Sequence, residues 1–373
     1  MLNIVIVQGA FFFFFPIQGG AVEKIWFRMG QEFAAVGNKV THISKTHADL
    51  PTVEMQHGVT YVRIKGYDTP KSLLILKLLD LFYSIHALFK IPSDADVIVT
   101  NTFWLPFLLR GKKGRKVYAD VQRVPKGQMK FYTHIGRLRA CSPAIEQAIR
   151  AELPVSSHSI VTYIPNPVPF DVPSTSTVKE KIILFVGRVH PEKGVDVLIK
   201  AYLDLSAEMR AQWKLVIVGP HEIKDGGGGD TYLKEVQELA APAKVEILFT
   251  GPLFKEADLK EWYAKSTLFC YPAQDGSGDA APVAPREAMA YGCVPIVSAL
   301  PCFNDFIEDH KNGCIFDQAS ANQIASLTHI FEELIADPEL TARLSKAAIL
   351  VLKTYASQTI AQQFLNDFKT LIK

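Results

Sequence analysis

The strongest constraint on the fold is an alternation of short apolar runs and longer helical patterns that occurs twice along the chain. Short apolar runs predict buried strands, and apolar residues at helical spacing predict the helices between them. Such an alternation is typical of parallel sheets covered by helices on both faces. The runs that we interpret as strands are residues 2–7, 39–44, 97–100, 181–186, 214–218, 245–250, 268–271 and 295–297.

The alternation restarts near residue 181, after a stretch rich in Pro, Ser and Thr at residues 165–177. This composition is typical of a linker, and 373 residues are enough for two domains. We therefore expect an α/β protein with two Rossmann-like domains, residues 1–168 and 169–356, that face each other across a cleft. The last helix, over about residues 357–373, is able to pack on either domain, including back on the first.

The composition narrows the class of protein. Apolar residues make up 48% of the chain and charged residues 21%, which argues against disorder as the main state. The 40 Lys and Arg nearly balance the 38 Asp and Glu, which argues against a nucleic-acid partner. The five cysteines are scattered and form no CxxC pair, so we expect buried thiols in a reducing compartment and no zinc site.

Two apolar segments bear on localisation. The phenylalanine run at residues 11–15 has no Lys or Arg before it, which favours an apolar loop over a signal peptide and predicts a cytoplasmic protein. The segment at residues 73–89 is short for a membrane span. It is interpreted either as an amphipathic core helix or as a helix lying at the inner membrane face. The cations that would favour the second interpretation are Lys71, Lys90, Lys112, Lys113, Arg115 and Lys116.

Two loops have the chemistry of phosphate sites. In open parallel sheets, ligands bind beyond the carboxyl ends of strands, where helix N-termini present free N–H groups. Gly19 and Gly20 follow the first strand and open a helix, although a tight turn is an alternative explanation. Gly187 ends another strand, and Arg188 and Lys193 follow it in the sequence GRVHPEKG. Two cations at the start of a helix would neutralise a diphosphate leaving group.

A third segment contains two carboxylates at a spacing of eight residues. Glu287 begins a helix of small residues, where a carboxylate can accept hydrogen bonds from a ribose or sugar diol. Asp279 lies in a glycine-rich loop that could bend over a ligand. The alternative roles are a charge favoured by the helix dipole for Glu287 and a turn residue for Asp279.

The segments GRVHPEKG (187–194) and DAAPVAPREAMAYGCVPIVS (279–298) resemble the signature of the retaining glycosyltransferases of family 4. Members of that family have the GT-B fold. They hold the diphosphate of a nucleotide-sugar donor with a Gly-Arg…Lys-Gly pair and carry an E-x7-E motif. The resemblance extends over roughly residues 160–320 and is weak over the first 150.

The resemblance implies a role for each matching residue. Arg188 and Lys193 would take the donor diphosphate, Asp279 the donor sugar and Glu287 the ribose. The other donor-binding residues that it implies are Gly19 and Gly20 against the phosphates, Gly187 at the strand end, and Gly251 with Leu253 beside the base.

This chain departs from the family pattern at three places. Asp279 replaces the usual Glu and is one methylene shorter. Asp120 stands where the family often has a histidine near the donor sugar, and is interpreted either as its catalytic substitute or as an ordinary strand-end Asp. Residues 299–301, Ala-Leu-Pro, replace a Gly-Gly pair. A basic stretch with Arg123, Lys126 and Lys130 is expected on the acceptor side, facing an anionic acceptor such as a lipid diphosphate.

The function that the resemblance implies is retaining transfer of a hexose or N-acetylhexosamine to a hydroxyl of a glycan or lipid-linked glycan, in bacterial surface polysaccharide or glycoconjugate synthesis. The donor would be a nucleoside-diphosphate sugar, with UDP expected as its nucleotide, and neither a metal nor another cofactor is required. Two alternatives remain open, a sugar-nucleotide 2-epimerase with the GT-B fold and a noncatalytic two-lobed nucleotide-sugar-binding protein.

Overall fold

In a computed structural model the chain divides into two compact units. The first comprises Met1–Phe170 with Tyr355–Lys373, and the second Asp171–Thr354. Predictions that concern residues 13–15, 19, 71, 173–177 and 245 lie outside the described part of the chain. The structure describes residues 1–12, 20–70, 72–172, 178–243, 246–253, 255–276 and 279–372.

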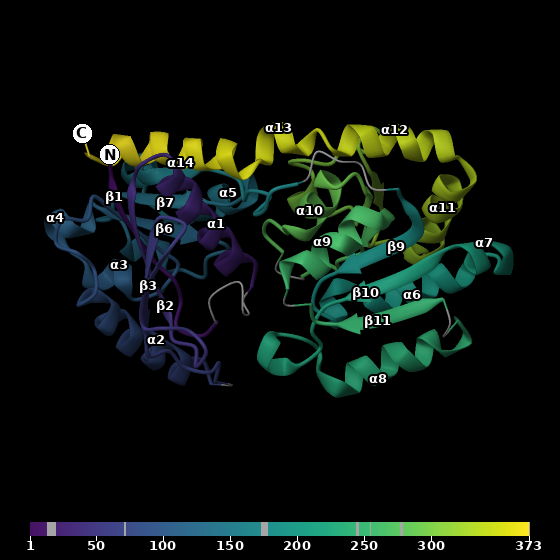
Figure 1. Cartoon of the computed structure of the whole chain (residues 1–373), viewed down its shortest axis with the longest axis horizontal. Helices are drawn as coiled ribbons and strands as arrows, with labels where there is room; N and C mark the ends of the chain where they lie inside the picture. The colour runs from purple at the N-terminus through teal and green to yellow at the C-terminus, as the bar shows by residue number, and fades with distance from the viewer. Residues whose placement is uncertain are drawn as a thin grey trace. The chain divides into compact units, whose positions relative to one another are not determined.

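The first unit is built on an eight-stranded sheet with the strand order β3-β4-β2-β1-β5-β6-β7-β8 (Figure 1). Neighbouring strands pair in parallel, except that β3 and β4 form an antiparallel hairpin at one edge. The strands are β1 (Asn3–Val7), β2 (Lys39–Lys45), β3 (Val53–Gln56), β4 (Val59–Ile64), β5 (Val97–Thr100), β6 (Val117–Val121), β7 (Arg137–Ala140) and β8 (Val161–Tyr163).

The helices of the first unit differ in how they bury their apolar residues. In α1, Ile25, Met29 and Phe33 recur every four residues and are fully buried, so one helix face packs on the sheet. The helices are α1 (Ala21–Ala35), α2 (Leu73–Leu88), α3 (Leu105–Leu108), α4 (Gly111–Gly114), α5 (Pro143–Glu152) and α14 (Ser357–Ile372).

The helix α2 is not the core helix that its apolar composition suggests. Its buried residues are Asp80, Tyr83, Ser84 and Ala87, and most of its leucines are exposed or half-buried. Asp80 faces inward, and its carboxylate accepts hydrogen bonds from the backbone N–H groups of Phe103 and Trp104, just before α3. The expectation of an amphipathic core helix is therefore wrong, since the apolar face points outward.

The second unit contains a six-stranded sheet in which all pairs are parallel, with the order β11-β10-β9-β12-β13-β14. Its strands are β9 (Glu180–Val186), β10 (Lys214–Val218), β11 (Ile247–Gly251), β12 (Ser266–Tyr271), β13 (Val294–Ser298) and β14 (Cys314–Phe316). Its helices are α6 (Val195–Asp204), α7 (Ala207–Gln212), α8 (Gly229–Ala240), α9 (Glu256–Lys265), α10 (Ala284–Ala290), α11 (Gln323–Ala336), α12 (Pro338–Ala348) and α13 (Val351–Tyr355), whose last residue falls in the first unit. The expected α/β class with two parallel-sheet domains is confirmed.

The C-terminal helix α14 packs on the first unit. Phe364 lies 5.1 Å from the Trp26 ring on α1, and Phe368 lies 4.9 Å from the Tyr118 ring on β6, both between ring centroids. The Tyr118 hydroxyl also donates to Asp367 at 2.9 Å. The chain thus returns to its first unit through an apolar helix face and a partly buried hydrogen bond.

Two further expectations can be compared with the structure. The five cysteines are all buried and form no disulfide. No helix among the described residues combines the length and the apolar character that crossing a bilayer requires.

Candidate functional site

The loop from β9 to α6 contains the predicted diphosphate motif. It leaves the sheet at Gly187, makes a short 3₁₀ turn over Pro191–Lys193, and enters α6 at Val195. Gly194 has φ +65°, and a Cβ there would lie 2.0 Å from the Pro272 carbonyl oxygen. This position therefore requires glycine, and the close approach presses the loop against the segment that follows β12.

Lys193 of this loop forms an ion pair with Asp279, which follows β12. The Lys193 ammonium lies 2.6 Å from each carboxylate oxygen of Asp279, and Lys193 is only 3% exposed. The Tyr271 hydroxyl donates to the same carboxylate at 3.4 Å. Burial and the nearby Asp279 charge raise the pKa of Tyr271 well above its usual value, so the hydroxyl keeps its proton.

Arg188 joins the same cluster through Glu192. Its guanidinium donates to Glu192 Oε1 at 2.5 Å and to the Gly226 carbonyl at 2.5 Å. The same Glu192 oxygen lies 3.6 Å from the Lys193 ammonium. A single carboxylate therefore links the two cations that were predicted to bind a diphosphate. Glu192 and Tyr271 were missed, although Glu192 stands inside the motif and Tyr271 ends the strand before Asp279.

Glu287 lies on α10 and is held by a hydrogen bond from α9, apart from the cluster around Lys193. It is 4% exposed, and its Oε2 accepts a hydrogen bond from the Tyr263 hydroxyl at 2.7 Å. Burial, together with the Glu287 charge, raises the pKa of Tyr263 well above its usual value. The Tyr263 ring stacks on Tyr291 with 6.0 Å between centroids. Tyr263 therefore fixes the carboxylate, and no sequence pattern pointed to it.

The predicted donor-binding residues of the second unit share one edge of the sheet. Gly187 follows the end of β9, Gly251 ends β11 with φ +70°, and Asp279 and Glu287 follow β12. Leu253, two residues beyond β11, is half-buried. Because the carboxyl ends of parallel strands meet at one edge, these residues lie where ligands of such sheets bind.

The glycine loop of the first unit is described only in part. Gly19 lies outside the described residues. Gly20 is the N-cap of α1, and its N–H donates to the Glu23 carboxylate at 3.0 Å. The N–H that was expected to meet a phosphate is thus engaged within its own helix.

Asp120 lies at the end of β6 in a buried polar network. Its side chain is fully buried, and its oxygens accept from Arg139 at 2.6 Å and from the Trp26 indole at 2.7 Å. Gln122 donates to both carboxylate oxygens, and Arg139 also binds Asn166. Since every donor comes from the first unit itself, this geometry favours the strand-end interpretation over a catalytic one.

The basic residues expected on the acceptor side are all exposed. Arg123, Lys126 and Lys130 follow β6, and the Lys130 ammonium lies 5.1 Å from the centroid of the Phe131 ring. They form a solvated surface, separate from the buried Asp120 network.

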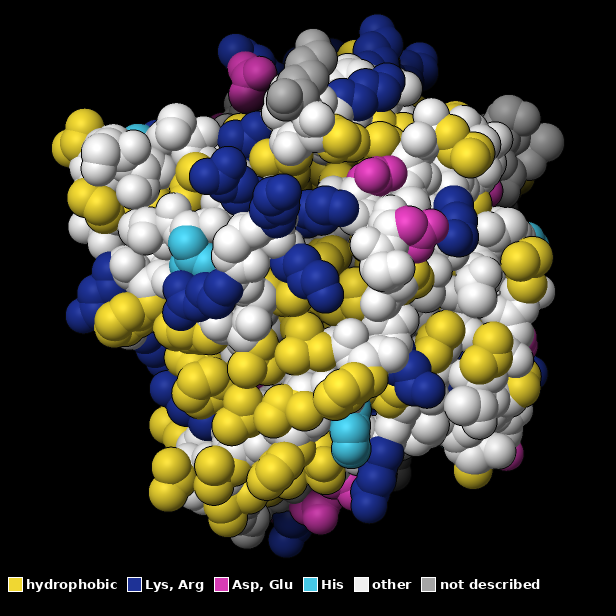
Figure 2. All heavy atoms as spheres, turned by 90° about the vertical axis from the view of Figure 1, so that its left-hand side faces the viewer, with side chains coloured by type: hydrophobic (Ala, Val, Ile, Leu, Met, Phe, Trp, Pro, Cys, Tyr) yellow, Lys and Arg dark blue, Asp and Glu magenta, His cyan; other side chains and the backbone are white. Residues whose placement is uncertain are grey.

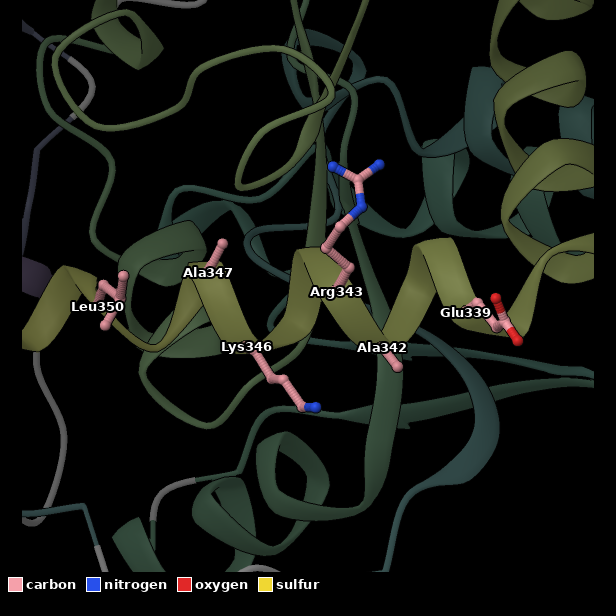
Figure 3. A pocket seen from close by; sticks show the side chains of 6 residues that line it. All are labelled: Glu339, Ala342, Arg343, Lys346, Ala347 and Leu350. Carbon is pink, nitrogen blue, oxygen red and sulfur yellow. The ribbon is translucent and has the colours of Figure 1, made fainter.

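A surface hollow on α12 and a cluster of possible metal ligands are two further candidate ligand sites. Figure 3 shows a surface hollow whose six lining residues come from α12 and the turn after it. Their side chains project to opposite sides of the helix, so they do not converge on a ligand. Within the described ranges, Asp309, His310 and Cys314 could offer three metal-ligand atoms. The Asp309 carboxylate, however, already accepts from the Ile315 N–H at 2.8 Å.

Comparison with known proteins shows that the second unit is similar to one protein family. Residues 170–351 match the model of the family described as "Glycosyl transferases group 1". The lipopolysaccharide 1,2-N-acetylglucosaminetransferase of Salmonella typhimurium is 26% identical over 188 residues, which cover 50% of this chain and 48% of that protein. The chain spans about half the length, or less, of the curated relatives it matches.

Solved structures extend the similarity of fold to the whole chain. Sucrose-phosphate synthase from Thermosynechococcus elongatus superimposes with a TM-score of 0.80 at 18% identity, covering 99% of both chains. HepE from Anabaena, in complex with UDP and glucose, superimposes with a TM-score of 0.71 at 16% identity, covering 99% of this chain and 100% of that one. The expected GT-B fold is confirmed.

Proposed function

We propose that this protein is a retaining glycosyltransferase of family 4 that transfers a sugar from a UDP-sugar to a hydroxyl of a glycan or lipid-linked glycan. The observation that carries the proposal is the cluster of Arg188, Glu192, Lys193 and Asp279 at the carboxyl edge of the second sheet. Two cations and a carboxylate there match the needs of a diphosphate and a sugar hydroxyl. The similarity of residues 170–351 to glycosyl transferases group 1 supports the same reaction class.

The ion pair between Lys193 and Asp279 suggests how the donor enters. In the structure each group neutralises the other. A diphosphate would draw Lys193 toward its own negative charge, which releases the Asp279 carboxylate to accept hydrogen bonds from sugar hydroxyls. Lys193 would then pair with the diphosphate, and the released Asp279 carboxylate would be held by hydrogen bonds from the sugar hydroxyls and from Tyr271.

The chemical step that we propose requires stabilisation of the leaving diphosphate. Negative charge grows on the phosphate as the sugar becomes cation-like, and Arg188 and Lys193 would offset that charge. Removing one such donor typically costs about 2.7–4 kcal/mol of transition-state stabilisation, or roughly 100- to 1,000-fold in rate. With two cations in the loop, we propose that the reaction requires no metal. Glu287, positioned by Tyr263, would hold the ribose.

We assign the acceptor to the first unit. The acceptor that we propose is a glycan or lipid-linked glycan in bacterial surface polysaccharide or glycoconjugate synthesis, and the transferred sugar is a hexose or N-acetylhexosamine. The similarity to the lipopolysaccharide 1,2-N-acetylglucosaminetransferase of Salmonella typhimurium supports this class. Enclosure of the donor and the acceptor would exclude water from the reaction.

The first test is a thermal-shift panel with UDP, GDP, ADP and CMP, each with magnesium or with EDTA. We expect UDP to raise the melting temperature selectively and EDTA to leave the shift unchanged. Selective stabilisation by another nucleotide would replace UDP as the proposed nucleotide of the donor. A shift that depends on magnesium would contradict the metal-free reaction. No shift with any nucleotide would contradict the donor site itself.

The second test measures turnover. Arg188→Ala should lower the release of UDP from a UDP-sugar by roughly 100- to 1,000-fold, whereas Arg343→Ala, an exposed arginine on α12, should leave it unchanged. Equal turnover of the two variants would overturn the role of Arg188. The anomeric configuration of the product, read by NMR, tests retention.

A further inference from the structure

The helix α2 of the first unit exposes its apolar side chains. Leu73, Leu74, Ile75, Leu78 and Phe82 are 77%, 70%, 49%, 47% and 54% exposed. Leu74, Ile75, Leu78 and Phe82 occupy the side of the helix opposite its buried Asp80, Tyr83, Ser84 and Ala87, and Leu73 is the first residue of the helix. Exposed leucine and phenylalanine at this density on one helix cost free energy in water, so the face needs a partner to cover it.

Aromatic residues continue the apolar face beyond the helix. The Trp104 indole donates to the Lys77 carbonyl of α2 at 2.7 Å, and Trp104 lies 5.5 Å from Phe107 between ring centroids. Phe107 in turn lies 5.9 Å from Phe131, which is 52% exposed. We call Leu73, Leu74, Ile75, Leu78, Phe82, Trp104, Phe107 and Phe131 the apolar surface.

Cations lie beside the apolar surface at three places, one of them at Phe103, the neighbour of Trp104. The Lys77 ammonium lies 4.6 Å from the Phe103 ring centroid, and the Lys130 ammonium 5.1 Å from that of Phe131. The Arg110 guanidinium donates to the Phe107 carbonyl at 3.0 Å. Long basic side chains that lie along apolar rings while keeping their charge in water are typical of membrane interfaces.

The sequence around the aromatic residues is strongly basic. Residues 101–136 contain eight Lys and Arg and one acidic residue, Asp120, which is buried against Arg139. Figure 2 shows the corresponding face, where hydrophobic side chains gather over one half and Lys and Arg over the other, with few acidic side chains. The exposed charge beside the apolar surface is therefore positive.

We propose that the apolar surface and its basic border dock on an anionic lipid bilayer, with α2 lying in the plane of the interface. The apolar side chains would enter the boundary between headgroups and acyl chains, and the cations would meet the lipid phosphates. Charge favours a bilayer over a second copy of the chain, because a symmetric dimer through this face would bring two basic borders together. The proposal rests on the first unit alone and does not depend on the proposed sugar transfer.

The test is co-sedimentation of the full chain with vesicles of phosphatidylcholine alone and of phosphatidylcholine mixed with phosphatidylglycerol. We expect binding to the anionic vesicles, weakened by high salt because salt screens the basic border. Leu74→Asp combined with Leu78→Asp should reduce the bound fraction by about tenfold or more. Lys112→Glu combined with Lys113→Glu should do the same on anionic vesicles.

A matched control separates the apolar surface from exposed apolar residues in general. Val155→Asp changes an 81% exposed residue of the same unit that lies outside the apolar surface, and its binding should equal that of the unchanged protein. Far-UV circular dichroism and the melting temperature verify that each variant is folded. The Trp104 fluorescence should be quenched by brominated lipids in the unchanged protein, and the quenching should be absent from Trp104→Phe.

Two results would overturn the proposal. One is the absence of binding to anionic vesicles at low salt by a folded, monodisperse protein. The other is sedimentation velocity showing a dimer that the Leu74→Asp and Leu78→Asp pair dissociates, which would assign the face to a second copy. Nucleotide binding is measured separately, so failure of vesicle binding with an intact UDP shift leaves the sugar-transfer proposal standing.

Discussion

The ammonium of Lys193 lies 2.6 Å from both carboxylate oxygens of Asp279, although the two residues are 86 positions apart in the chain. Lys193 comes from the loop after β9, and Asp279 from the segment after β12, which pairs directly with β9. Because adjacent parallel strands deliver their loops to the same edge, the sheet itself brings the two charges together. Their charges offset each other in a site where Lys193 is almost fully buried.

The energetic coupling of this ion pair is the first prediction. Lys193→Ala leaves Asp279 and Glu192 without their buried cation, and we expect a loss of unfolding free energy on the order of 3 kcal/mol. Asp279→Asn should also destabilise, because the carboxylate that Lys193 then keeps, Glu192, lies farther away, at 3.6 Å. The variant with both changes should lose less unfolding free energy than the sum of the losses in the two single variants. Urea unfolding of the four proteins measures the coupling, and strictly additive losses would contradict the ion pair.

The second prediction concerns Tyr263, which positions Glu287. Tyr263→Phe keeps the ring but removes the hydroxyl that donates to Glu287 Oε2. A buried acceptor left without its donor costs about 1–3 kcal/mol, so we expect UDP to bind roughly tenfold more weakly by calorimetry. Tyr202→Phe is the matched control, because its hydroxyl donates to the Trp213 carbonyl and not to a predicted ligand group. If both variants bind UDP equally, Tyr263 has only a structural role.

The third prediction is a loss of stability in acid caused by His42 on β2. His42 is fully buried, and burial, with a contribution from the Arg63 charge, lowers its pKa from 6.5 to about 3. Between pH 6.5 and about pH 3, His42 is protonated in the unfolded chain and neutral in the folded chain. The free energy of unfolding therefore falls as the pH drops through this range. The slope is about 1.4 kcal/mol per pH unit for this group.

A variant isolates that effect from the carboxylates that titrate in the same range. His42→Leu removes the titrating ring, so its stability relative to the unchanged protein should improve by about 2–3 kcal/mol between pH 7.5 and pH 4.5. Urea unfolding at the two pH values gives the comparison. A difference between the two proteins that does not change with pH would rule out the buried neutral imidazole.

The sequence predicts the fold best where strands contain uninterrupted apolar runs. After one or two polar residues at their starts, β1, β9 and β10 continue as unbroken apolar segments, as expected of strands buried on both faces. The strand β7 was not predicted, because Arg137 and Arg139 interrupt its apolar pattern. Arg139 is tolerated there because Asp120, Asn166 and the Ile164 carbonyl accept its hydrogen bonds, and these contacts appear only when the strands are placed side by side.

The candidate site likewise contains residues that the sequence predicts and residues that only the fold brings together. Arg188, Lys193, Asp279 and Glu287 stand in recognisable motifs, but Tyr263 meets its partner only after folding. The helix α2 is the opposite case. Its apolar spacing is clear in the sequence, yet spacing alone does not say whether the apolar face turns inward. In the structure that face turns outward, and the buried Asp80 on the other face accepts from the N–H groups of Phe103 and Trp104.

The last prediction separates the two interpretations of Asp120. Its carboxylate accepts from Arg139, Gln122 and the Trp26 indole inside the first unit. If its role is structural, Asp120→Asn should lower the unfolding free energy by about 3–5 kcal/mol, because Arg139 keeps its charge in a buried site without the paired carboxylate. The additional change Arg139→Gln should restore part of that loss, since it removes the uncompensated charge. The release of UDP per folded molecule should stay within about threefold of the unchanged protein, because a residue without access to substrate does not set the rate. A folded, fully stable Asp120→Asn protein with a loss of turnover of roughly 100-fold or more would instead identify Asp120 as a catalytic residue.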